Sequence, residues 1–185
     1  MKKFDAVIIG FGKGGKTLAG ALAAAGKTVA LAERSDKMYG GTCINVACIP
    51  TKALNHSAAL SAAMGGDFDE KAARYRAAIA EKRALTAKLR QKNYDKLASN
   101  PKITVLQGAA RFTGPHTVSV SGPQGSQELW GENLFINTGA RPFVPPIPGL
   151  AGNPRVYLSE TLMELEQLPR RLVIIGGGYI GMEFA

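Results

Sequence analysis

The opening of the chain alternates short apolar runs with glycine-rich breaks. Residues 5–9 and 28–32 are apolar and partly β-branched, so each run predicts a buried strand. Between them, residues 14–25 are rich in Ala and Leu and end at Gly26, which predicts a helix with a C-terminal glycine. The second strand ends at Glu33, and a strand, a helix and a strand form a βαβ unit, which builds parallel sheets.

The middle of the chain has helical spacing. The pattern predicts helices over 45–63 and 69–97, with Gly65 and Gly66 between them. In the second helix, apolar or small residues recur three and four positions apart, at Tyr75, Ala78, Ile79, Leu85 and Leu89. Because the rest of this helix is rich in Lys and Arg, we expect one long surface helix with a solvated basic face.

Short apolar runs follow, separated by glycine and proline. Residues 103–106, 117–120 and 134–137 are predicted to be strands of a small antiparallel meander. Residues 142–149, PFVPPIPG, predict a stiff connection, because proline fixes φ and lacks a donor. Residues 172–175 again predict an apolar strand that runs into glycines. This order of elements predicts the α/β class, with a parallel sheet, a long helical excursion and a meander.

Composition and charge limit the function classes. The chain has 185 residues, 45 % hydrophobic and 20 % charged, which fits one folded core and excludes disordered, collagen-like and disulfide-scaffold proteins. Its net charge is +9, but Lys and Arg are spread along the length, so we expect no nucleic-acid partner. The apolar run at residues 6–9 is too short for a secretory core, and no run could cross a membrane. We therefore expect a cytoplasmic protein with no membrane partner, whose thiols stay reduced unless they cycle in catalysis or bind metal.

The first candidate motif is GFGKGG, in which Gly10, Gly12 and Gly15 have GxGxxG spacing. A dinucleotide site needs glycine there, because the loop turns tightly, the backbone approaches a pyrophosphate and the helix packs closely on the strand. The helix directs its amide groups at the phosphates. Glu33, at the end of the second strand, is placed to bind the hydroxyls of an adenosine ribose. Together these features favour dinucleotide binding over a merely structural turn.

The same residues also fit a P-loop. GFGKGGKT matches GxxxxGKT, with Lys16 as the phosphate lysine and Thr17 as the metal hydroxyl. Against this, Glu33 has no role in a P-loop, and no later apolar strand ends in the Asp that would hold magnesium. A P-loop nucleotide-binding protein stays open as an alternative.

The second candidate motif is GGTCINVACIPTK, residues 40–52, with Cys43 and Cys48 five apart. His56 and His116 have no metal-ligand spacing relative to them, so no metal site is predicted. Two cysteines on the first turns of a helix can instead form a disulfide that cycles, and a helix N-terminus favours a reactive thiolate. The alternative is that both cysteines pack as small hydrophobic residues.

This motif resembles the redox motif of the class I pyridine nucleotide-disulfide oxidoreductases, which include glutathione reductase, dihydrolipoamide dehydrogenase and mercuric reductase. INTGARP, residues 136–142, is similar to the family's second flavin-contacting stretch, and GGGYIGMEFA, residues 176–185, is similar to its nicotinamide fingerprint. The resemblance spans the whole chain. GFGKGGKT and MYGGTCIN are most similar to the bacterial branch linked to reactive-chlorine resistance and copper reduction.

The resemblance implies two cofactors, FAD and NAD(P)H. The residues it implies for FAD are Gly10, Gly12, Gly15, Glu33, Arg34, Gly41, Thr42, Cys43, Lys52, Ala110, Thr138 and Gly139. Those it implies for the nicotinamide cofactor are Gly176, Gly178, Tyr179 and Gly181. Tyr179 matches the family's aromatic gate, with simple packing as the alternative.

The resemblance also implies the roles of the catalytic residues. Cys48 would face the flavin as the charge-transfer thiol, and Cys43 would be the interchange thiol that attacks substrate. Lys52 would lie against the flavin ring in a buried ion pair with Glu183, with a solvated lysine as the alternative. One departure is Ala47, where the family usually has glycine, and its methyl group is expected to cost about 1–3 kcal/mol if the site is tight.

The implied organisation is a Rossmann-like FAD-binding domain over 1–150, a connection over 151–170 and the start of a truncated NAD(P)-binding domain over 171–185. A βαβ unit needs about 30 residues, so we expect a fragment of a longer protein. The resemblance implies that the full-length protein is a homodimer and that this fragment is inactive alone. The implied oxidant is a small molecule such as a disulfide, or a metal ion. A flavin-binding fold whose cysteines only pack stays open as a further alternative.

Overall fold

A computed structural model describes residues 1–185. The chain forms two compact units. The first contains Met1–Asn45 and Ala87–Ala140, and the second contains Val46–Thr86 and Arg141–Ala185. None of the helices combines the length and the apolar composition that a membrane span requires.

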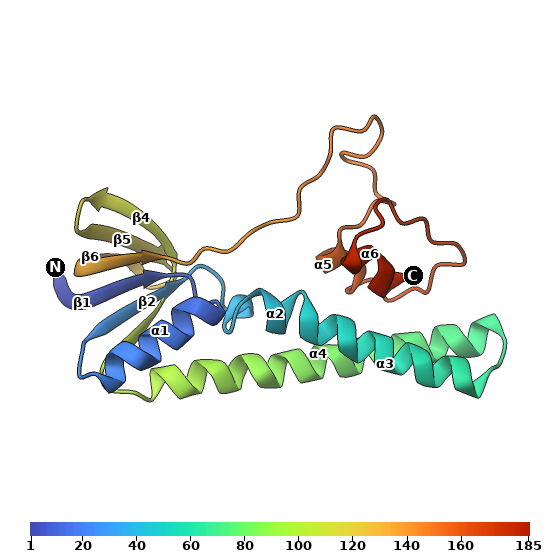
Figure 1. The fold of residues 1–185 in the computed structure, drawn as a ribbon, viewed down its shortest axis with the longest axis horizontal. Helices are drawn as coiled ribbons and strands as arrows, with labels where there is room; N and C mark the ends of the chain where they lie inside the picture. Colours follow the sequence, from blue (N-terminus) through green and yellow to red (C-terminus); the bar gives the residue numbers. More distant parts are fainter. The chain divides into compact units, whose positions relative to one another are not determined.

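The first unit is built on a six-stranded sheet with the order β3-β2-β1-β6-β5-β4 (Figure 1). The strands are β1 (Lys2–Ile9), β2 (Val29–Glu33), β3 (Ile103–Gln107), β4 (Ala109–Gly114), β5 (Thr117–Gly122) and β6 (Gly125–Ile136). β3, β2, β1 and β6 are parallel, and β5 and β4 continue the sheet antiparallel. The predicted α/β class, with a parallel Rossmann-like sheet and a meander, is confirmed.

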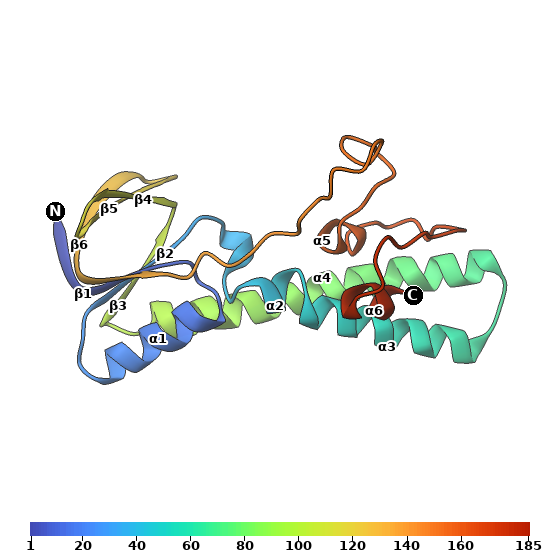
Figure 2. The same ribbon diagram turned by 45° about the horizontal axis from the view of Figure 1, so that its top comes forward.

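Two apolar clusters cover the two faces of this sheet, because successive side chains of a strand point to opposite faces. On one face, Ile8 and its neighbours pack against α1 (Lys13–Ala24), which Figure 2 shows running beneath the strands. The small residues Ala19 and Ala23 of α1 are buried in this contact. On the other face, Val7 packs with apolar residues of the meander, Val118, Val120 and Leu129.

The strand predictions for residues 103–137 need correction. The segment from Ile103 pairs in parallel with β2 and is not part of the meander, because its apolar side chains extend the buried sheet. β4 was not predicted, and β6 begins at Gly125 instead of residue 134. Polar residues alternate with apolar ones in both strands, since one face of the meander is exposed, and this hides them from a search for apolar runs.

The second unit contains α3 (Cys48–Met64) and the first part of α4 (Phe68–Ala98), which lie side by side and antiparallel (Figures 1 and 2). Gly65 and Gly66 have positive φ values of 67° and 96° and form the turn between them. The helix predicted over 45–63 is confirmed as α3, which begins at Cys48, and a short helix that was not predicted, α2 (Thr42–Asn45), precedes it. Between them Ala47 has a non-helical backbone, with φ −142° and ψ −104°.

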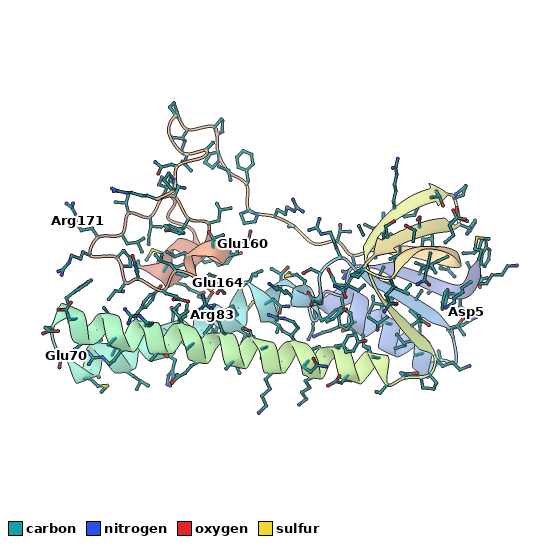
Figure 3. All side chains as sticks on the ribbon, turned by 180° about the vertical axis from the view of Figure 1, so that it is seen from behind. Asp5, Glu70, Arg83, Glu160, Glu164 and Arg171 are labelled. Carbon is teal, nitrogen blue, oxygen red and sulfur yellow. The ribbon has the colours of Figure 1, made fainter.

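The basic face predicted for the long helix is wrong at one position. Lys82 is only 2 % exposed, whereas Leu85, assigned to the packed face, is 40 % exposed. The reason is a segment around α5 (Ser159–Leu162) that supplies acidic partners: Glu164 pairs with Lys82 and accepts from Arg83 Nε at 2.8 Å. Figure 3 labels Arg83 of this helix and Glu164 of the segment after α5 near each other.

In the last part of the chain, the strand predicted over 172–175 is absent, whereas the irregular connection predicted over 142–149 is present. Residues 172–175 form no strand, and Val173 is 85 % exposed, because no other segment offers them a backbone partner and a strand needs one. Residues 142–149 contain neither helix nor strand, as their prolines predict. α6 (Tyr179–Phe184) closes the chain.

Candidate functional site

The carboxyl ends of the parallel strands converge on the glycine motif. β1 ends at Ile9 just before Gly10, β2 ends at Glu33, and β6 leads into Asn137. In the sheet, β2 and β3 lie on one side of β1 and β6 lies on the other, so the chain connections run in opposite directions from β1. Ligands bind at such a switch point in open α/β sheets. The fold therefore gathers the predicted dinucleotide residues of the first unit at one edge of the sheet.

The glycine loop has no room for side chains at its key positions. Gly10 has φ +108°, and a Cβ atom there would overlap the carbonyl oxygen of Asn137. A Cβ atom on Gly15 would overlap the carbonyl oxygen of Gly10. α1 begins at Lys13, and its N-cap Gly12 provides no side-chain hydrogen bond to the first turn. The backbone at this helix end is thus shaped as a cradle for phosphate groups.

Glu33 stands beside this loop at the end of β2. Its Oε2 accepts a hydrogen bond from the backbone N–H of Phe11 at 2.9 Å, and its Oε1 accepts from that of Ser35 at 3.2 Å. The carboxylate is half-buried, with lone pairs left for further donors. Such a group can orient the loop and also accept hydrogen bonds from ribose hydroxyls.

Asn137 contributes to the loop, although sequence reasoning assigned it no role. Its Nδ2 donates to the carbonyl oxygen of Gly10 at 3.1 Å, and its backbone N–H donates to Ile9 at 2.8 Å. A Cβ atom on Gly12 would lie 3.0 Å from the same amide nitrogen. INTGARP marks this stretch in the sequence, but only the β1–β6 pairing brings Asn137 to Gly10.

The turn before Cys43 packs against the glycine loop. Gly41 has φ +85°, and a Cβ atom there would lie 2.5 Å from Gly12 Cα. Asn45 ties this turn together, because its Nδ2 donates to the carbonyl oxygens of Gly41 at 2.9 Å and Tyr39 at 3.1 Å. Arg90 of α4 donates to Asn45 Oδ1 at 2.8 Å. This network, also missed from sequence, holds Thr42 and Cys43 at the start of α2, where both are exposed.

The remaining flavin residues implied for the first unit lie at strand ends or on β4. Thr138 and Gly139 follow β6 and are exposed, and Gly139 has φ +75°. Arg34 is exposed directly after β2. Ala110 of β4 pairs with Val120 of β5. Two residues before Ala110, the N–H of Gly108 donates to the Glu33 carbonyl oxygen at 2.8 Å. This last bond keeps the start of β4 next to the ribose-side carboxylate.

The P-loop alternative does not fit this backbone. α1 already begins at Lys13, so Gly15 and Lys16 lie inside the helix instead of closing a long loop. Lys16 Nζ donates to Asn93 Oδ1 at 2.5 Å, and Thr17 is exposed. The geometry is that of a dinucleotide loop with a short turn between strand and helix.

In the second unit, Cys48 begins α3 and is exposed. Lys52, one turn later, pairs with Glu183 of α6 at a distance of 3.0 Å from Nζ to Oε1. The pair forms, but its predicted burial is wrong, because the side chains are 69 % and 37 % exposed. Ala47, just before Cys48, has its carbonyl bound by Thr51 Oγ1 at 2.7 Å.

The second glycine motif repeats the backbone of the first. Gly176 has φ +114°, close to the +108° of Gly10. Gly178 is the N-cap of α6, with φ −73° and ψ 171°, and a Cβ atom on Gly181 would overlap the Gly176 carbonyl oxygen. Tyr179 is 81 % exposed, which disfavours the packing alternative within this unit. The backbone geometry of the first glycine loop therefore recurs here, although the strand predicted before it is absent.

Known proteins share these features. The chain is 51 % identical over 185 residues to the probable pyridine nucleotide-disulfide oxidoreductase RclA of Escherichia coli (strain K12), covering 100 % of this chain and 40 % of that protein. It is 38 % identical over 191 residues to a mercuric reductase of Streptomyces lividans, covering 98 % of this chain and 40 % of the relative.

A solved structure also matches. The Cu(II) complex of the HOCl-induced flavoprotein disulfide reductase RclA from Escherichia coli aligns with a TM-score of 0.88 and 51 % identity, over 100 % of this chain and 39 % of that one. The chain thus spans about two fifths of the length of these relatives. The family description "Pyridine nucleotide-disulphide oxidoreductase" matches residues 4–185. This chain belongs to the pyridine nucleotide-disulphide oxidoreductase family.

Proposed function

We propose that this chain is the flavin-binding and redox-active part of an NAD(P)H-dependent reductase whose oxidant is a disulfide or a metal ion. The family is FAD-dependent and uses NAD(P)H. One observation carries the proposal: the backbone of Gly41 lies against Gly12 and Lys13, so the segment with Cys43 packs on the phosphate cradle itself. A cofactor bound there would extend from the cradle toward a cysteine.

The shape of the first unit fits FAD. The cradle formed by Gly10, Gly12 and Gly15 would bind the pyrophosphate through backbone N–H groups, because the N-cap Gly12 has no side chain to occupy the N–H groups of the first turn of α1. Glu33 would accept hydrogen bonds from the adenosine ribose. Gly41, Thr42, Thr138 and Gly139 would line the middle of the cofactor, with Arg34 and Ala110 toward its adenine side. When bound, FAD supplies a carrier that takes a hydride from NAD(P)H and returns two electrons.

The cysteines would carry those electrons to substrate. Two electrons would break the Cys43–Cys48 disulfide, and with two protons, one from the hydride donor's transfer and one from solvent, they would leave a dithiol. For a disulfide substrate, the Cys43 thiolate attacks one sulfur, forms a mixed disulfide and releases the first substrate thiol. Cys48 then attacks Cys43, which re-forms the protein disulfide and releases the second substrate thiol. Both cysteines are exposed, which supports this role over simple packing.

The second unit would serve the reducing side. Lys52, oriented by Glu183, would hold a positive charge beside the flavin ring. Gly176, Gly178 and Gly181 would bind the phosphates of NAD(P)H, and Tyr179 would gate its nicotinamide. We infer an FAD-binding domain over 1–150, a connection over 151–170 and an NAD(P)-binding segment over 171–185, in a cytoplasmic homodimer. The name of the mercuric reductase and the Cu(II) complex of RclA favour a metal ion among the oxidants.

The roles of the cysteines can be separated by visible spectra of the full-length protein. In Cys43→Ser, the remaining Cys48 thiolate lies next to oxidised flavin, so a long-wavelength shoulder should appear without reductant and fade when acid protonates the thiolate. Cys48→Ser removes the donor and should show plain oxidised flavin at every pH. Both variants should accept hydride from the nicotinamide cofactor and fail to reduce disulfides.

Two results would count against this scheme. A shoulder in Cys48→Ser instead of Cys43→Ser would reverse the two roles. No shoulder in either variant, with flavin fully bound, would show that the cysteines do not lie beside the flavin.

A further inference from the structure

Lys16 is one of the two lysines of GFGKGGKT, and the proposed function uses neither of them. We propose that Lys16 is a positioning residue for Cys43, whose thiolate its ammonium group stabilises, and that Asn93 holds Lys16 in place. This inference rests on the proposed function, in which Cys43 attacks substrate. Three sets of contacts within the first unit support it.

The ammonium group of Lys16 is held in one direction. Its Nζ donates to Asn93 Oδ1 at 2.5 Å, and the side chain is half-buried. Asn93 is itself fixed, because its Nδ2 donates to the carbonyl oxygen of Leu89 one turn earlier at 2.7 Å. With the amide nitrogen committed to the helix, the oxygen faces Lys16, so a flexible lysine becomes an oriented charge.

The same two residues border the turn that carries Cys43. A Cβ atom on Gly40 would lie 3.3 Å from Asn93 Cγ, so α4 touches this turn where it holds Lys16. On the other side, a Cβ atom on Gly41 would lie 3.3 Å from the backbone nitrogen of Lys13. The first turns of α1 therefore meet the turn just before Thr42 and Cys43. Since Lys16 Nζ is bound to the same Asn93 side chain that borders Gly40, its charge lies beside the turn that leads into Cys43.

The charges agree with this placement. Burial is the largest cause that lowers the pKa of Lys16, and the neighbouring ammonium groups of Lys13 and Lys96 lower it further. Cys43 acts in the opposite direction and raises the pKa of Lys16. The attraction between the ammonium group of Lys16 and the thiolate of Cys43 is one energy that both groups share. A thiolate that stabilises the charged form of Lys16 is therefore itself stabilised by that ammonium group. The other charged groups around this turn are Arg90, beside Asn45, and Glu33 and Asp36, beside Tyr39.

The test is the pH profile of Cys43 alkylation. In the full-length protein with Cys48→Ser, the rate of iodoacetamide addition to the Cys43 peptide is followed by mass spectrometry between about pH 5 and 9. Lys16→Met keeps the length of the side chain and removes the charge. We expect its profile to move to higher pH, with alkylation near pH 6 slower by roughly fivefold. Lys16→Arg should restore most of the parent profile, because it keeps the charge.

Two further variants separate the local charge from other effects. Asn93→Leu removes the acceptor at similar volume and should shift the profile in the same direction by less, because the ammonium group remains but is no longer oriented. Lys88→Met removes an exposed lysine of α4 outside the cluster and should leave the profile unchanged. An equal shift in Lys88→Met would overturn the proposal, since net charge would then explain it.

An unchanged profile in Lys16→Met would also overturn the proposal. If that variant loses FAD while its alkylation matches that of the flavin-free parent, the ammonium group serves the cofactor phosphates and not the thiol. The alkylation profile does not depend on the flavin spectrum. A failure of the proposed function, seen as no shoulder in either cysteine variant, is therefore distinguishable from a failure of this inference.

Discussion

Each carboxylate oxygen of Glu33 accepts a backbone hydrogen bond. A substitution at Glu33 can therefore disturb the loop as well as the binding of a cofactor. Glu33→Ala would remove the acceptor for the Phe11 N–H as well as any ribose contact. Glu33→Gln keeps one oxygen for the Phe11 N–H and loses the charge together with the acceptor for the Ser35 N–H, so it disturbs the loop less than Glu33→Ala while weakening the ribose contact. We expect this variant to bind FAD more weakly by about 1.5–3 kcal/mol and to release flavin on dialysis. Glu132→Gln, at an exposed position of β6, is the control. Full flavin retention in Glu33→Gln would contradict the proposal that Glu33 binds the ribose.

Asp5 predicts an acid-dependent contribution to stability. Hydrogen bonds from the backbone and hydroxyl of Thr28, both at 2.7 Å, and from Lys27 lower the pKa of Asp5 from 3.8 to about 2. A depressed folded-state pKa stabilises the fold above the unfolded value, and this is lost as pH falls toward the folded value. Asp5→Asn should therefore unfold more easily near neutral pH, and the difference should shrink between about pH 4 and 2. Denaturant melts at several pH values measure this, and a pH-independent difference would contradict it.

Individual residues were predictable from sequence where local sterics alone fix them. Gly10, Gly12 and Gly15 are of this kind, because a loop of that spacing between strand and helix excludes side chains. Asn137, Asn93 and Arg90 were not, because their partners lie far away in the sequence. Asparagine and arginine are ordinary surface residues until the fold supplies an acceptor or donor for them.

Elements were predictable where both faces are buried. β1 and β2 are continuous apolar runs because α1 covers one face and the meander covers the other. β4 and the first half of β6 have one exposed face, and their mixed composition gave no signal. The opposite error occurred at 172–175, where an apolar run predicts a strand but the chain offers no partner. Hydrophobicity indicates burial, whereas a strand also requires a neighbour.

The segment at 159–166 is attached to the α3–α4 hairpin by an asymmetric ion pair, because Lys82 is buried whereas Glu164 is half exposed. Burial alone would raise the pKa of Glu164, but its hydrogen bonds from Lys82 and Arg83 lower it overall. Glu164→Gln leaves a buried ammonium group without a counter-charge and should destabilise the protein by about 1–3 kcal/mol. Lys82→Met leaves Glu164 with Arg83 and water and should cost less. Thermal melts compare the two, and a larger loss in Lys82→Met would contradict this account.

For the whole molecule, the two compact units each take two separate pieces of the chain, because α4 begins in one unit and ends in the other. Sequence reasoning predicts domains as consecutive blocks, over 1–150, 151–170 and 171–185. The predicted boundaries divide the chain by the cofactor that each part binds, whereas the two units divide it by compactness. The predicted boundaries therefore stay a prediction. The family and the fold were predictable because a glycine motif with strict spacing lies within a βαβ unit and a cysteine motif with strict spacing follows that unit.

The bond between Asn137 and Gly10 spans 127 positions of the chain, and it has a consequence for synthesis. The glycine motif is synthesised well before β6, but the Gly10 carbonyl finds this partner only after β6 has been made and has inserted beside β1. Closing a contact over such a separation is slow compared with forming α1. A nascent chain that stops short of residue 137 carries the whole motif and lacks the clamp that shapes it. The shape of the glycine loop therefore arises late in folding, although the motif itself lies early in this sequence.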